Sequence, residues 1–234
     1  CDRMGAAIRN DMGEMELLTG NQIGSLLGWY RIKTMFDLGW LTESNRSRAV
    51  LVKTLVTTDL QRSIAEKYGI NVIDTLTGFK YIGEKLKKYE DAIPNEKKGD
   101  YRNLTEEESR KLRLEYSKFF VFGGEESYGY LGSDFVRDKD GNASALMFAE
   151  LAAFAMSEGT SIAGLRDRIW GEYGVHLEQG KSLVMEGGEG ARKIAALVKS
   201  YSVKPPEIVD GSNAIAVRDY ARGCLLYTSP SPRD

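Results

Sequence analysis

The amino-acid sequence predicts an α/β fold with a mixed, mostly parallel sheet sandwiched by helices. Three observations support this fold class: apolar strands alternate with helices along most of the chain, several helices begin with a capping motif, and the pattern changes after about Gly174. Alternation at this spacing favours parallel strands joined by right-handed crossovers. The flanking regions are expected to be the remnant of a preceding α/β domain and the start of a C-terminal α+β domain.

The first expected helix covers residues 20–33. Thr19 and Gln22 have the spacing of a capping box, in which the threonine oxygen accepts hydrogen bonds from the first free N–H groups of the helix. Apolar residues then recur at helical spacing, so the helix is expected to be amphipathic with one apolar stripe: Ile23, Leu26, Leu27 and Tyr30.

Two strand–helix units come next. Residues 49–56 are nearly all apolar and rich in β-branched side chains, as expected for a strand buried on both faces of a parallel sheet. Thr57–Gln61 is interpreted as a second capping box, which predicts a helix over 60–68 closed by Gly69. The second unit has a strand over 70–76 and a helix over 79–89.

The remaining elements of the expected sheet domain follow a polar segment, residues 90–103. Thr105 and Glu108 form a third capping box, which predicts that a short helix begins there. The later elements are a strand over 118–122 and helices over 143–157 and 161–173.

The region after Gly174 is expected to begin another domain. Its elements are a strand over 181–185, a Gly-rich turn over 186–190, a helix over 191–201 and a strand over 214–217. Residues 224–234 show no periodicity and no expected partner, so they are treated as a non-native-looking tail. The expected domains are residues 1–39, 40–174, 175–223 and 224–234.

Composition excludes several classes of function. With 32 Lys and Arg against 34 Asp and Glu, the net charge of -2 provides no broad basic field for nucleic acid. No apolar run approaches the roughly 20 residues of a membrane helix. Cys1 and Cys224 lie near the two ends, so we expect no disulfide framework and a cytoplasmic protein. His176 is the only histidine, which argues against a zinc site and a Ser-His hydrolase.

The loops that leave the strands are where a ligand is expected, because parallel α/β sheets bind ligands outside the carboxyl ends of their strands. Three such loops are residues 57–59, 75–80 and 123–129. In the third loop, two glycines are followed by Glu125, Glu126 and Ser127. The side-chain oxygens of these three residues suit a polyhydroxylated ligand. The alternative is that one of the two glutamates caps the next helix.

Two basic positions near these loops are ambiguous by themselves. Lys80 falls in the first turn of its expected helix, where the positive end of the helix dipole disfavours a cation unless an anion is near. A side chain that bends to solvent explains it equally well. The charged loop 137–141 alone predicts only a solvated loop. The glycines near 123 and 187 match no nucleotide-binding fingerprint.

The motifs together resemble the alpha-D-phosphohexomutase family, specifically its phosphoglucomutase/phosphomannomutase branch. They are Asp2-Arg3, Thr75–Lys80, Gly124–Gly129 and Arg137–Gly141, in this order. The resemblance runs from Asp2 to about Arg222. It implies the end of the second domain in residues 1–39, a complete sugar-binding third domain in 40–174 and a truncated fourth domain in 175–223, so we expect an interior fragment.

The resemblance implies roles for individual residues. Asp2 would be the last of three Mg²⁺ ligands, Arg3 would contact the transferring phosphoryl group, and Lys139 would transfer a proton or stabilise charge at the reacting oxygen. The implied substrate-binding residues are Thr77, Gly78, Lys80, Glu125, Ser127 and Arg137. Because phosphoglucosamine mutases typically carry a different residue at the position of Glu126, a glucose or mannose phosphate is favoured.

The implied activity is an intramolecular phosphotransfer that interconverts hexose 1-phosphate and hexose 6-phosphate. It would proceed through a phosphoserine and a bisphosphate intermediate, with Mg²⁺ and an activator of the glucose 1,6-bisphosphate type. We expect this chain alone to be inactive, because the serine and two metal ligands would lie upstream. A non-catalytic sugar-phosphate-binding module remains an alternative. An aldolase or dehydrogenase is disfavoured by the missing nucleotide fingerprint.

Overall fold

The protein is represented by a computed structural model that divides the chain into two compact units, Cys1–Glu178 and Gln179–Asp234. The structure describes residues 1–10, 12–178, 183–209, 211–214, 216–219 and 224–227.

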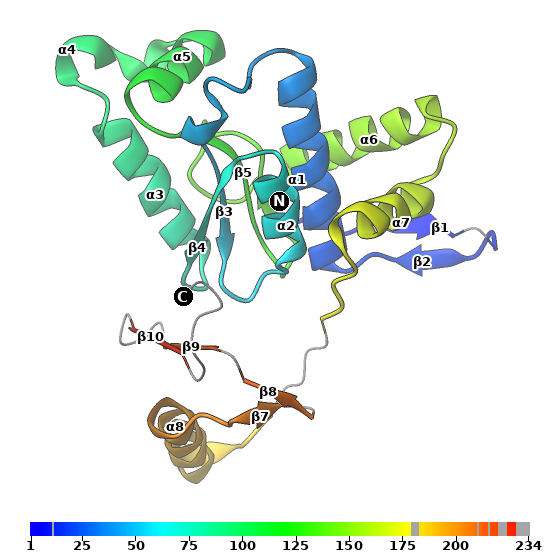
Figure 1. Cartoon of the computed structure of the whole chain (residues 1–234), viewed down its shortest axis with the longest axis vertical. Helices are drawn as coiled ribbons and strands as arrows, with labels where there is room; N and C mark the ends of the chain where they lie inside the picture. Colours follow the sequence, from blue (N-terminus) through cyan, green and yellow to red (C-terminus); the bar gives the residue numbers. More distant parts are fainter. Residues whose placement is uncertain (11, 179–182, 210, 215, 220–223, 228–234) are drawn as a thin grey trace. The chain divides into compact units, whose positions relative to one another are not determined.

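A four-stranded sheet forms the centre of the first unit (Figure 1). Its strands, in spatial order, are β4 (Asn71–Thr75), β3 (Ala49–Thr54), β5 (Phe119–Glu125) and β6 (Gly129–Leu131). The first three strands are parallel and β6 is antiparallel to β5. This confirms the predicted mixed, mostly parallel sheet. Every residue of β3 and β5 is buried, as expected for strands covered on both faces.

Helices cover both faces of this sheet, and the alternation of side chains along β3 shows how. Ala49 and Leu51 belong to the larger core cluster, whereas Val50 and Val52 belong to a second cluster. The larger cluster includes residues of α1 (Gly20–Asp37), α2 (Leu60–Lys67), α6 (Gly141–Ser157) and α7 (Ile162–Tyr173). The second cluster is formed with α3 (Phe79–Asp91).

Helix α1 belongs structurally to the sheet domain, although we expected it in a separate segment, residues 1–39. It packs against β5, α2 and α6 within one compact unit. Its seven residues from Ile23 to Trp29 are all buried, so the expectation of a single apolar stripe is also wrong. The reason is that the helix lies between the sheet and other helices. A preceding hairpin of β1 (Ala7–Arg9) and β2 (Met15–Leu17) was not predicted.

Two of the three predicted capping boxes form. Thr19 and Thr105 each accept from the backbone N–H three residues ahead, and the side chains of Gln22 and Glu108 bond back. The capping box predicted at the start of α2 is wrong. That helix begins after Asp59, whose carboxylate makes no capping bond because it faces Lys53.

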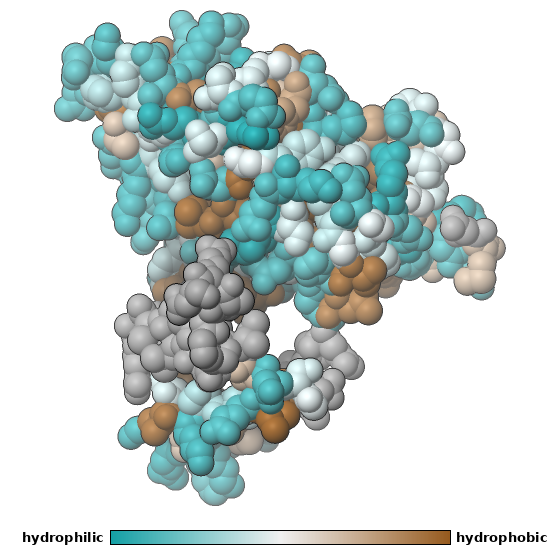
Figure 2. All heavy atoms as spheres, viewed as in Figure 1, coloured by the Kyte–Doolittle hydropathy of each residue, from teal (hydrophilic) through white to brown (hydrophobic). Residues whose placement is uncertain are grey.

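The polar segment after α3 contains short helices. They are α4 (Asn95–Lys98) and a 3₁₀ turn (Tyr101–Asn103). The helix predicted from Thr105 follows as α5 (Glu106–Tyr116), and another 3₁₀ turn (Arg46–Arg48) precedes β3. Hydrophilic residues dominate the visible face over α4 and α5 (Figure 2). Among the described residues, no helix is both long and apolar enough to span a membrane.

The second unit differs from its prediction in three places. Helix α8 (Gly187–Val203) begins inside the segment expected to be a Gly-rich turn. The expected strand 181–185 lies partly outside the described residues, and its described part, 183–185, is not a strand. Among the described residues of this unit, the strands form two antiparallel pairs: β7 (Ile208–Val209) with β8 (Ser212–Asn213), and β9 (Ala216–Asp219) with β10 (Cys224–Tyr227). Residues 224–227 of the expected tail therefore have a partner strand.

Candidate functional site

The loops after β4 and β5 meet at the carboxyl ends of the strands. The backbone N–H of Gly78 donates a 3.0 Å hydrogen bond to Oε1 of Glu125. Gly78 has φ +120°, a conformation that L-residues rarely adopt, and it directly precedes the first residue of α3. The N–H therefore belongs to the positive end of that helix, which favours a nearby carboxylate. Thr77, the preceding residue, is exposed at the same loop.

Lys139 lies beside Glu125 at this edge. A Cβ built at Gly129 would lie 2.5 Å from Cδ of Lys139 and 3.4 Å from Oε2 of Glu125, so the two side chains pass the same point. The Lys139 Nζ is 2.9 Å from Oδ1 of Asp138 and 3.6 Å from Oδ2 of Asp2. The hydrogen bond to Asp138, with the charges of Asp138, Asp2 and Glu125, raises the pKa of Lys139. The side chain is therefore a stable cation.

The first residues of the chain are attached to the same edge. The N–H of Met4 donates to the carbonyl of Tyr128 at 3.1 Å, and the N–H of Gly141 donates to the carbonyl of Cys1 at 3.3 Å. These bonds position Asp2 and Arg3, whose side chains are exposed, next to the loop after β5. The structure thus brings together Asp2, Arg3, Thr77, Gly78, Glu125 and Lys139.

Ser127 and Lys80 lie near this group, but Arg137 points elsewhere. Ser127 is half-buried in the turn that follows Glu125, and the Lys80 Nζ lies 4.8 Å from the centre of the Tyr81 ring. The guanidinium of Arg137 pairs with the buried carboxylate of Glu90 near the opposite end of α3 from Gly78. A buried carboxylate needs a cation, and this need explains the direction of Arg137.

Neither Glu125 nor Glu126 caps the helix that comes next in the chain, so the alternative considered from the sequence is wrong. The chain turns directly from β5 into the antiparallel strand β6. Tyr128 has φ +69°, which allows the tight turn. Oε2 of Glu126 instead accepts from the hydroxyls of Thr54, at 3.3 Å, and Thr57, at 3.4 Å. Glu126 therefore ties the turn to the end of β3.

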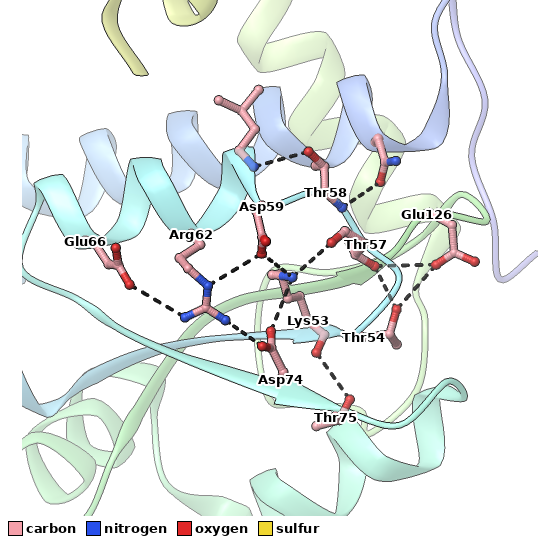
Figure 3. A network of polar contacts seen from close by, with 12 residues as sticks. Lys53, Thr54, Thr57, Thr58, Asp59, Arg62, Glu66, Asp74, Thr75 and Glu126 are labelled. Carbon is pink, nitrogen blue, oxygen red and sulfur yellow. Dashed lines mark hydrogen bonds and ion pairs between the residues drawn. The ribbon is translucent and has the colours of Figure 1, made fainter. Parts of the chain in front are cut away.

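A buried ionic network that was not predicted from the sequence lies behind these threonines (Figure 3). Lys53 is 1% exposed, and its Nζ lies 3.0 Å from Oδ1 of Asp59 and 3.2 Å from Oδ1 of Asp74. Lys53 and Asp74 are register partners in the parallel pair β3–β4. Arg62 completes the network through both carboxylates. The available signal was a lysine inside an otherwise apolar strand, which requires buried counter-charges.

The described residues do not form a magnesium site by themselves. No group of three His, Cys, Asp or Glu side chains among them is arranged to hold a metal. Asp2, the expected ligand, is 64% exposed and lies beside the ammonium of Lys139, which competes with a cation for its oxygens. To hold a metal, Asp2 would need further ligands from outside the described residues.

Comparison with known proteins decides the family. Residues 19–173 match the family model described as phosphoglucomutase/phosphomannomutase, alpha/beta/alpha domain III. The chain belongs to the phosphoglucomutase/phosphomannomutase family. The domain III match includes α1 and the whole four-stranded sheet, which agrees with the packing of that helix.

The relatives of this chain include a human enzyme and a bacterial enzyme. Human phosphopentomutase is 29% identical over 95% of this chain and 32% of its own length. A phosphoglucomutase of Staphylococcus aureus is 29% identical over 94% of this chain and 34% of its own length. The solved structure of the phosphoglucomutase parafusin from Paramecium is 16% identical, with a TM-score of 0.48, over 90% of this chain and 31% of that one. The chain thus spans about a third of the length of these relatives.

Proposed function

We propose that this chain supplies the sugar-recognition site of a phosphosugar mutase. The observation that carries the proposal is the convergence of Glu125, the Gly78 N–H and Lys139 at the carboxyl edge of a domain III fold. One carboxylate, one fixed helix N-terminus and one cation at a single edge match the groups of a phosphorylated sugar: hydroxyls that donate and a phosphate that needs positive charge.

Glu125 is suited to hold sugar hydroxyls. Its Oε1 is oriented by Gly78, while Oε2 lies on the side of Lys139, so the carboxylate can accept from a ligand without losing its backbone bond. Ser127 extends the same turn with an oxygen that either donates or accepts. The proposed ligand therefore has adjacent hydroxyl groups.

The cations at this edge suit the phosphate. Lys139 remains protonated at neutral pH, and the exposed side chains of Arg3 and Lys80 come from the segments on either side of it. Phosphoryl transfer depends mainly on positioning and charge neutralisation. We therefore propose that Lys139 neutralises charge, or transfers a proton, at the reacting oxygen.

The proposed reaction of the full mutase moves phosphate between the C1 and C6 oxygens of a hexose by way of a phosphoserine. The phosphoserine, the remaining metal ligands and the bisphosphate activator of the full mutase are part of this proposal. We expect the chain alone to bind the sugar phosphate without turning it over. A pentose phosphate is the second candidate substrate, because one of the relatives is a phosphopentomutase.

Calorimetric titration of the chain with glucose 1-phosphate, mannose 1-phosphate, ribose 1-phosphate and unphosphorylated glucose tests the proposal. We expect binding of a sugar phosphate, and at least tenfold weaker binding by Glu125→Gln. The exposed glutamate of α5 provides the matched control, Glu115→Gln, which should bind like the wild type. Equal affinity of wild type and Glu125→Gln for every ligand would overturn the proposed site.

A further inference from the structure

Lys53 is a fully buried cation behind the candidate site, at the end of β3. Besides the two carboxylates, its Nζ donates a 2.9 Å hydrogen bond to the backbone carbonyl of Thr57. The ammonium thus has three oxygen partners, which matches its three N–H donors. A buried charge is tolerated only when it is satisfied in this way.

The charged groups around Lys53 fix its position from two elements. Asp74 approaches from β4, whereas Asp59 and Arg62 come from the start of α2. Arg62 bonds to Oδ2 of Asp74 at 2.6 Å and extends to Glu66 at 3.6 Å. Two cations and three carboxylates therefore join β3, β4 and α2, and they restrict where the loop between β3 and α2 lies (Figure 3).

Thr57 connects this network to the turn that carries the proposed sugar ligands. Its carbonyl accepts from Lys53, while its hydroxyl lies 2.7 Å from that of Thr54 and 3.4 Å from Oε2 of Glu126. Thr54 and Thr57 are themselves buried. Thr57 thus contacts Lys53 through its backbone carbonyl and Glu126 through its side-chain hydroxyl.

The other side of the turn packs against the start of α1. A Cβ at Gly20 would overlap the carbonyl of Glu126, so backbone touches backbone at this point. The N–H of Thr58 also donates to Oδ1 of Asn21 at 3.1 Å. Helix α1 therefore supports both the turn and the loop after β3, and the carboxylate of Glu126 is the bridge between them.

We propose that Lys53 is a positioning residue for the sugar site, acting through Thr57 and Glu126 on the turn that presents Glu125 and Ser127. The cation fixes the Thr57 carbonyl, the adjacent hydroxyl pair fixes one oxygen of Glu126, and the anchored glutamate sets the path of the turn. This inference rests on the proposed function for its effect on binding, but its effect on the turn is independent of any ligand.

The test uses Thr57→Val, which removes the hydroxyl but retains the carbonyl that Lys53 needs. Thr57→Ser is the conservative variant, Lys53→Met removes the charge, and Thr42→Val is the matched control on the loop before β3. The readouts are the amide ¹H–¹⁵N NMR shifts of Glu125–Ser127 without ligand and the dissociation constant for glucose 1-phosphate.

We expect Thr57→Val to shift the amides of Glu125–Ser127 and to weaken binding about five- to tenfold, the size of one lost hydrogen bond. Thr57→Ser should restore both readouts, and Thr42→Val should change neither. Adding Lys53→Met to Thr57→Val should weaken binding no further, because both changes interrupt the same series of contacts from Lys53 through Thr57 to Glu126.

Unchanged amide shifts of the turn in Thr57→Val would overturn the inference, as would additive losses in the double variant. If Lys53→Met does not fold, unchanged amide shifts in Thr57→Val would still overturn the inference. If the wild type binds no sugar phosphate, the proposed function fails, whereas the ligand-free shifts still confirm or contradict the positioning role.

Discussion

The N–H of Gly78 and the carboxylate of Glu125 are joined by a 3.0 Å hydrogen bond although 47 residues separate them in the chain. Because β3 lies between β4 and β5, this bond reaches across the end of the central strand. It links the start of α3 to the last residue of β5, and so two loops of the proposed site hold a common geometry before any ligand binds.

Gly78→Ala should destabilise the chain and weaken sugar-phosphate binding. The space beside Gly78 is open, with the nearest atoms of Tyr81 3.8 Å from a built Cβ, so the cost arises from φ +120° and is about 1–3 kcal/mol. Urea unfolding and calorimetry measure the two effects. Gly13→Ala, at φ +79° in open space, is the matched control and should lose stability without losing affinity. Wild-type affinity in Gly78→Ala would contradict the role of this loop.

Gly20→Ala should be among the most destabilising substitutions in α1. The new methyl group would overlap the backbone carbonyl of Glu126, and neither backbone can move freely, so we expect a loss of about 3 kcal/mol. Gly171→Ala in α7 meets no atom within 4 Å and should instead raise the free energy of unfolding by about 0.5–1 kcal/mol. Urea unfolding of both variants checks the contrast, and equal stabilities would contradict the close packing.

Lys139→Met should reduce affinity for glucose 1-phosphate more than affinity for glucose. Its raised pKa keeps the ammonium charged, so the lost attraction concerns the phosphate. We expect a loss of about tenfold or more for the phosphate ester, measured by calorimetry at pH 7. Lys111→Met on the exposed face of α5 removes the same charge at a distance and should have little effect. Equal losses in both lysine variants would indicate only a general charge effect.

Asp59→Asn should remove a contribution to stability that depends on pH. Partial burial alone raises the pKa of Asp59, but the hydrogen bond and charge of Lys53 and the charge of Arg62 outweigh it and lower the pKa from its ordinary value. The contribution of Asp59 to stability is therefore complete above the pKa that Asp59 has in the unfolded chain. It is lost as the pH falls through the lower pKa that Asp59 has in the folded protein. Wild type should exceed Asp59→Asn in stability at pH 6, and the difference should shrink below about pH 4. A difference that is constant from pH 6 to pH 3 would contradict this.

Local sequence signals predicted much of the fold. The capping boxes at Thr19 and Thr105 form because their hydrogen bonds join residues only three positions apart. The strands β3 and β5 followed from continuous apolar runs. The same reasoning failed at α2, where Thr57–Gln61 was interpreted as a local capping box, but Asp59 faces Lys53 and Gln61 is buried. It also missed the start of α8, since glycines suggest a turn whether or not a helix continues through them.

The sequence alone determined the order of β3, α2, β4, α3, α5, β5, α6 and α7, the strand-end loops and the motifs that led to the family. Those features depend on interactions between near neighbours and on the period of apolar residues. Tertiary structure alone decided that Lys53 meets Asp74, that Arg137 turns to Glu90, and that Gly20 must lack a side chain. Strand register and the pairing of buried charges join distant segments, and a buried ion takes whichever partner the completed fold brings within reach.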